Sequence, residues 1–293
     1  MSRRLTPILM ASPPVLLVVL FVGLPVVNAV GLTLGYTGGL NQTIARIGLG
    51  THETHSWAPT FGAYQEVLST PRFWSDLLVT VAITLLVTTV VVLVAWALAL
   101  FMRLTENPFN KIMPTLAVVP MFIPGVIGAW AALTFWSSDG FIGSVLRSVG
   151  LPAPQIGFTS GMVVIAQTWE SLPFAVLMLT SAISSVPQAL IDASRDSGAS
   201  TVQTVFRVIL PMTAVPTVIA VTFTAISVIG SFTVPYLTGP SAPSMLGVTM
   251  TRYFQAYGQP QQAVVMAIMV FGMAAALGVL YVWSNWRSAK EEL

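Results

Sequence analysis

Six long apolar runs constrain this chain more than any other feature of its sequence. Each holds the roughly 20 apolar residues that a helix needs to cross a bilayer, and they lie near residues 8–32, 77–102, 112–136, 160–184, 209–233 and 263–284. Lipid offers no partners to backbone N–H and C=O groups, so each run is expected to bond internally as a helix. The sequence therefore predicts an all-α integral membrane protein with six transmembrane helices, forming a single domain over residues 1–293.

The composition excludes several other classes of protein. Charged residues make up 8% of the chain, whereas a soluble domain carries about 25%, so too few charges remain to cover a soluble surface. The net charge of +2 is small and its basic residues are scattered, which argues against a nucleic-acid partner. The chain has no cysteine, which excludes disulfides and thiolate chemistry.

The basic residues predict the orientation of the six helices. With the N-terminus inside, the inner segments hold eight of them: Arg3, Arg4, Arg103, Lys111, Arg195, Arg207, Arg287 and Lys290. The outer segments then hold four: Arg46, Arg72, Arg147 and Arg252. Because basic residues favour the cytoplasmic side, we expect a multi-pass protein of the plasma or inner membrane with both termini in the cytoplasm.

A polar segment at about 185–211 separates the fourth and fifth runs. Gly198 is suited to a left-handed break between two short helices, and Ser200 with Gln203 fits a capping box that starts the second helix. Val202, Val205, Phe206 and Ile209 follow helical spacing and predict one apolar stripe. Periodicity alone leaves two interpretations open, an ordinary interfacial turn and a compact knob that contacts a soluble partner.

The spacing of particular residues in this segment favours the second interpretation. Asp192-Ala193-Ser194, Gly198 and Leu210-Pro211 stand at the spacing of the EAA–G–I-LP signature. The segment resembles the cytoplasmic coupling loop of permease subunits in binding-protein-dependent ABC importers, with Asp192 in place of the usual Glu and Ser194 in place of the second Ala. Trp169, Pro173, Phe174 and the stretch at 230–240 extend the resemblance. It assigns contact with an ATPase to Asp192, Ala193, Ser194, Gly198, Ala199, Val202, Phe206, Leu210 and Pro211.

The resemblance also implies a fold and partners. The fold would be that of a type I ABC importer permease. The partners would be a second permease subunit, two ATPase subunits and an external solute-binding protein. The chain has no G-x-x-x-x-G-K-[ST] motif of its own, so ATP and Mg²⁺ are assigned to the partner ATPase, and no cofactor or enzymatic activity is expected in this chain. His52 and His55 lack the i, i+4 spacing of H-E-x-x-H, and no metal site is expected.

Glu170 is the one acidic or basic residue placed well inside a predicted helix. Such a residue is costly in lipid and usually faces a bundle interior or an aqueous path. Glu170 either lines the solute path or bonds a neighbouring helix. The other candidates for the path are Trp169, Trp130, Ser227, Ser231 and Phe232, whose alternative roles are helix packing and interfacial anchoring.

The sequence leaves the solute open between two groups. The stretch at 232–247 is similar to polyamine-type permeases, and Glu170 suits a cation, whereas the Trp169–Phe174 pattern is also similar to carbohydrate-type permeases. The polyamine-like group is slightly favoured. The alternatives from other classes are an ion-coupled secondary carrier, which would usually carry several intramembrane ionisable groups and paired repeats, and a membrane anchoring subunit without transport.

Overall fold

The computed structural model describes residue 10, residues 12–105 and residues 107–291, and they contain helices but no strand. Arg3 and Arg4, on which part of the predicted orientation rests, lie outside the described residues. The described residues form two compact units, one made of those up to Trp74 with Thr249–Met269 and the other made of those between Ser75 and Val248 with those from Val270 onward. Two long helices, α5 (Pro71–Leu104) and α16 (Pro260–Glu291), run through both.

The first unit holds the first apolar run and short helices that follow it. A continuous helical segment covers Ser12–Thr33 and includes a π-helical turn η1 (Val19–Gly23) and α2 (Leu24–Thr33). The remaining elements are η2 (Gly39–Asn41), α3 (Gln42–Ile47), α4 (Gly62–Ser69) and most of α15 (Leu246–Gln255). Buried Gln261 ties this unit together, because its amide donates to the carbonyls of Leu32 and His52.

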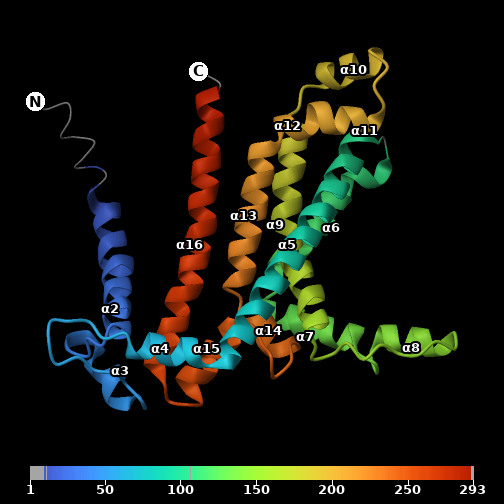
Figure 1. Cartoon of the computed structure of the whole chain (residues 1–293). Helices are drawn as coiled ribbons and strands as arrows, with labels where there is room; N and C mark the ends of the chain where they lie inside the picture. Colours follow the sequence, from blue (N-terminus) through green and yellow to red (C-terminus); the bar gives the residue numbers. More distant parts are fainter. Residues whose placement is uncertain (1–9, 11, 106, 292–293) are drawn as a thin grey trace, which may run out of the picture. The chain divides into compact units, whose positions relative to one another are not determined.

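The second unit contains the bundle that positions the candidate site. Its helices are α6 (Met113–Val118), α7 (Gly125–Trp136), α8 (Phe141–Ser148), α9 (Ser160–Ser184), α10 (Gln188–Asp196), α11 (Thr201–Thr204), α12 (Leu210–Met212), α13 (Ala214–Ile229) and α14 (Thr233–Thr238), with the shorter turns η3 (Pro108–Lys111), η4 (Val119–Phe122) and η5 (Val205–Ile209). Within this unit α10 and α11 lie at one end of the bundle, while α7 and α8 lie at the other (Figure 1).

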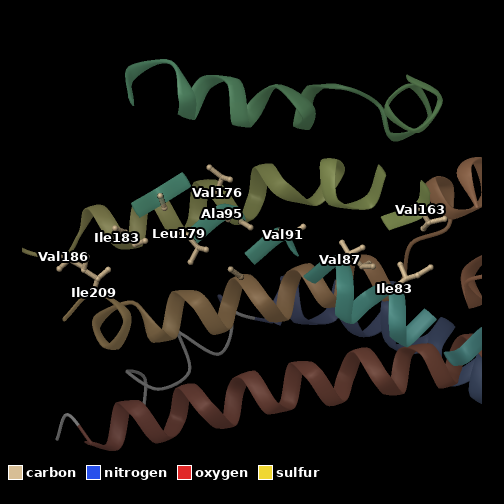
Figure 2. Packing of buried hydrophobic residues seen from close by; sticks show 14 of the residues in the cluster. Ile83, Val87, Val91, Ala95, Val163, Val176, Leu179, Ile183, Val186 and Ile209 are labelled. Carbon is tan, nitrogen blue, oxygen red and sulfur yellow. The ribbon is translucent and has the colours of Figure 1, made fainter. Parts of the chain in front are cut away.

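The core of the bundle consists of small and β-branched side chains. Figure 2 shows Ala95 of α5 beside Val176 and Leu179 of α9, with Val91 and Val87 farther along the same cluster. These five side chains are almost completely buried. Small residues such as Ala allow helix backbones to approach closely, and α5 and α9 share this buried cluster.

Four helices are long and apolar enough to cross a membrane alone, and six spans result if each of two bent helix pairs counts as one. The predicted run 112–136 is broken because Pro124 lacks an N–H and holds Ile123 in an extended conformation. The predicted run 209–233 bends by 74° after Met212. Pro216 has no N–H to bond the Met212 carbonyl, so one helical hydrogen bond is missing at the bend. The Thr213 hydroxyl, at the same place, donates to the Ile209 carbonyl. The sequence thus located both runs but not their bends.

Candidate coupling loop and solute path

The segment between α9 and α13 folds into two short helices joined by a tight turn. Gly198 has φ +82°, the left-handed conformation predicted for it. Its N–H donates to the Arg195 carbonyl at 2.9 Å and ends α10. The predicted capping box is present, since Ser200 Oγ accepts from the Gln203 N–H and Gln203 Oε1 accepts from the Ser200 N–H. Local chemistry therefore fixes both helix ends around the turn.

Three contacts attach this loop to the bundle. Ile191 of α10 and Ile209 of η5 are almost fully buried in the same core cluster as Leu179. Arg103, in the last turn of α5, donates from Nη2 to the Val186 carbonyl at 2.9 Å. The loop is therefore packed against the ends of α5 and α9.

The two arms of the loop are also joined to each other. The hydroxyl groups of Ser194 in α10 and Thr204 in α11 are 2.9 Å apart and share a hydrogen bond. Thr204 is buried, and Ser194 is the residue that replaces the second alanine of the signature. This substitution supplies a hydrogen bond that alanine cannot make, so it stiffens the loop.

The predicted coupling residues divide between the surface and the join of the two arms. Exposed are Asp192, Ala193, Gly198, Val202, Phe206 and Pro211, whereas Ser194, Ala199 and Leu210 are half-buried. The expected single apolar stripe is not formed, because Val205 packs on the core with Ile209 while Val202 and Phe206 are each 63% exposed. The wider π-helical turn of η5 separates the two pairs.

Asp192 of α10 is exposed as well. Asp192 Oδ1 accepts a hydrogen bond from Gln188 Nε2 at 2.9 Å, which holds it on the surface of α10. The loop thus presents the apolar side chains of Val202 and Phe206 together with charged residues of both signs, among them Asp192 and Asp196. Such a surface is suited to press into a groove of a soluble partner.

One face of α9 is exposed and contains Glu170. The exposed residues on this face are three or four positions apart and therefore form one row along the helix: Glu170, Phe174, Leu177, Ser181 and Ser184. The ring of Phe174 contacts Phe223 of α13, with centroids 6.0 Å apart, and Phe223 in turn contacts Tyr281 of α16 at 6.4 Å. Aromatic rings from three helices therefore adjoin the row.

Glu170 of α9 and Ser227 of α13 lie at the same height along the two helices. The helices α9 and α13 are antiparallel, because α9 ends and α13 begins at the loop end of the bundle (Figure 1). Glu170 stands four residues before Phe174, and Ser227 four residues after Phe223, so each lies about one turn, roughly 6 Å, from the paired rings in the same direction. Both are exposed, and the carboxylate of Glu170 also adjoins Gly125, the first residue of α7.

The remaining predicted path residues lie elsewhere. Trp169 turns its ring against Gly128 of α7 and lines an apolar cavity of about 600 Å³. Trp130 is 60% exposed and lines another cavity near Asp139. Ser231 is half-buried after α13, and Phe232 stacks on Tyr236 with centroids 5.1 Å apart. The structure thus gathers Glu170 and Ser227 on one face and separates both tryptophans from it.

Two contributors to these surfaces were not singled out as site residues from sequence. Phe223 follows Glu170 by 53 positions in another helix, and nothing in its local pattern distinguishes it from a core residue. Arg103 was identified only as a charge at a helix end, although its bond to Val186 joins segments 83 residues apart. The sequence did show that Glu170 and Phe174 are one helical turn apart and so share a face of their helix.

A family profile described as "Binding-protein-dependent transport system inner membrane component" matches residues 60–287. The chain belongs to this family. It is therefore an inner-membrane permease component of an ABC importer, as the coupling-loop signature predicted.

Relatives of known role and a solved structure agree with this assignment. The chain is 27% identical to the trehalose transport system permease protein SugA of Mycobacterium tuberculosis, over 96% of this chain and 89% of SugA. It is 26% identical to the spermidine/putrescine transport system permease protein PotB of Escherichia coli, over 80% of this chain and 86% of PotB. A bacterial ABC transporter involved in alginate import has a similar fold, with a TM-score of 0.76 at 18% identity over 98% of this chain and 96% of that one. The predicted type I importer permease fold is confirmed.

Proposed function

We propose that the segment 185–211 couples this permease to ATP hydrolysis in two separate ATPase subunits. ATP and Mg²⁺ bind those subunits and not this chain. The observation that carries the proposal is that a segment with exposed Val202, Phe206 and Asp192 is attached to α5 and α9 by buried side chains and a hydrogen bond. Closure of the ATPases would move the loop, and the loop would move the helices that bound the solute path.

The other partners follow from the same arrangement. A second permease subunit covers the exposed face of α9 and α13, because an uncovered carboxylate facing lipid is costly. An external binding protein delivers the solute at the end of the bundle opposite α10, and both termini lie in the cytoplasm. A solute held between the two permeases then gains access to each side of the membrane in turn.

We further propose a sugar or similar polyhydroxylated solute. The α9–α13 face combines aromatic rings of Phe174, Phe223 and Tyr281 with the hydroxyl of Ser227 and one carboxylate, Glu170. Aromatic faces pack on the apolar faces of sugar rings, while the carboxylate and hydroxyl bond their hydroxyl groups. A polyamine is the second candidate, because Glu170 is an anion with no salt-bridge partner among the described residues. This reverses the slight preference drawn from sequence.

Replacement of Glu170 by Gln distinguishes the two solutes. Gln keeps the size and hydrogen bonds but removes the charge, so uptake of a sugar such as trehalose should fall by about tenfold or less, whereas uptake of spermidine should fall by about a hundredfold. The measurement is ATP-dependent uptake of both solutes by the complete transporter in proteoliposomes, with Ser181→Ala on the same face as the control. Loss of protein level in Glu170→Gln, with no change in uptake per transporter, would contradict a place on the path.

A further inference from the structure

A pocket of about 440 Å³ lies where the second half of α7 meets the segment that leads into α9. Its lining includes one face of α7, with Trp130, Leu133 and Thr134 three and four positions apart, and Gln155 and Phe158 from the segment before α9. Because α7 and α8 lie at the end of this unit opposite α10 (Figure 1), a cytoplasmic coupling loop puts the pocket on the outer side of the membrane.

Two aromatic rings from separate segments are exposed in this pocket. Trp130 is 60% exposed and Phe158 is 61% exposed, so a ligand can reach both. The segment that carries Phe158 lies against α7, because a Cβ added at Gly157 would be 3.6 Å from Leu133 Cδ1. Exposed aromatic rings beside a few polar groups are typical of a small-molecule site.

Phe158 is held in an unfavourable backbone conformation. Its φ is +55°, and among the residues that the structure describes it is the one non-glycine residue with a positive φ, which is unusual for a bulky side chain. The Thr159 hydroxyl holds the adjoining backbone, since it donates to the Ile156 carbonyl at 2.6 Å and accepts from the Met162 N–H at the start of α9. Residues in such conformations cluster at ligand sites. Burial of the ring does not account for this one, because the ring is exposed.

The polar groups of the pocket suit hydroxyl groups better than a cation. Asp139 and Gln155 line it and are exposed. Asp139 is the one charged residue among the described lining residues, and its Oδ1 lies 3.5 Å from Arg147 Nη1. The nearby arginine offsets the attraction of this carboxylate for a cation. A carboxylate and an amide can both still bond hydroxyl groups.

We propose that this pocket binds a sugar ring of the solute at the outer side, before the solute reaches the α9–α13 face. Glu170 is ten residues beyond Ser160, the first residue of α9, which is about 15 Å along the helix axis. Phe158 precedes Ser160, so the pocket and the carboxylate are separate sites. The sugar class and the direction of import rest on the proposed function, whereas binding at the pocket is measured without transport.

The test measures binding of trehalose to the complete transporter in nanodiscs, without the external binding protein, by saturation-transfer difference NMR. Phe158→Asn removes the ring but suits the backbone, because asparagine tolerates a positive φ, and it should weaken binding by roughly five- to tenfold. Phe141→Asn removes another exposed phenylalanine that does not line the pocket and should retain binding. Asp139→Asn should weaken binding by about threefold or less, because an amide still bonds hydroxyl groups.

The contrary results are distinct. Equal binding by the wild type and Phe158→Asn would overturn the proposal, and so would binding of spermidine in place of trehalose that Asp139→Asn abolishes. The emission of Trp130, taken as the difference between the wild type and Trp130→Phe, should be shielded by trehalose from acrylamide. Quenching of this emission by brominated lipid, with no effect of trehalose, would assign the ring to the membrane interface and overturn the site.

A failure of this site differs from a failure of the proposed solute path. Trehalose uptake in proteoliposomes with no binding that depends on Phe158 would overturn this inference alone. Binding that depends on Phe158, with uptake unchanged in Glu170→Gln, would support the outer pocket and contradict the path along α9.

Discussion

Gly198 provides the sharpest test of how the loop keeps its shape. Its φ of +82° is unfavourable for residues with a side chain, and a Cβ added there would meet no atom within 4 Å. Substitution therefore costs backbone energy without a steric clash. That cost is about 1–2 kcal/mol for an ordinary residue, which lowers the population of the native turn by about 5- to 30-fold. Asn tolerates this conformation better than Ala, and Val tolerates it least.

The expected order of coupled uptake is Gly198, then Asn, Ala and Val. The assay compares solute uptake with ATP hydrolysis in proteoliposomes, at equal amounts of inserted transporter. Uptake per ATP hydrolysed should fall along the series, while membrane insertion stays constant because the apolar helices are unchanged. Equal coupling in Gly198→Val and Gly198→Asn would refute the reasoning, since Val and Asn differ strongly in how well they tolerate the left-handed conformation.

Two further predictions concern packing. Ile191→Ala should destabilise the docking of α10 by about 2–5 kcal/mol, because Ile191 is almost fully buried; limited proteolysis of the loop should accelerate, and the adjacent exposed Leu190→Ala serves as control, with equal cleavage of both variants contradicting the prediction. Gly128→Ala should lower the thermal unfolding temperature, because the new Cβ would lie 2.3 Å from the ring of Trp169, and such overpacking costs about 1–3 kcal/mol. Gly272→Ala, which meets no neighbouring atom within 4 Å, should not lower it; an unchanged unfolding temperature in Gly128→Ala would show that the Trp169 ring moves freely.

The sequence predicted the helical architecture well because lipid leaves a chain few choices. Apolar runs give the helices, as at 160–184, where prediction and structure coincide. The bends at Pro124 and Thr213 were missed since proline is tolerated in membrane helices when neighbouring groups satisfy the freed backbone. Whether a given proline breaks a helix depends on packing against other segments, which a single sequence does not state.

The local features of the coupling loop were predictable, and its contacts were not. Gly198 and the Ser200–Gln203 capping box depend on adjacent residues, so their conformations follow from sequence. Val202 and Phe206 are exposed, whereas Val205 and Ile209 pack on the core. This difference depends on a π-helical turn, which the sequence did not reveal. The path face likewise required the antiparallel course of α9 and α13 and the contact of Phe174 with Phe223, from which the level of Ser227 and Glu170 follows.

The most direct test of ATPase coupling uses a single cysteine. The chain has no cysteine of its own, so Phe206→Cys places one reactive thiol on the exposed face of the loop. In the purified complete transporter, a bifunctional thiol reagent should join this residue to an ATPase subunit, and ATP should change the yield. Labelling of Phe206→Cys by a membrane-impermeant thiol reagent added outside intact cells, with no cross-link to an ATPase, would contradict the account.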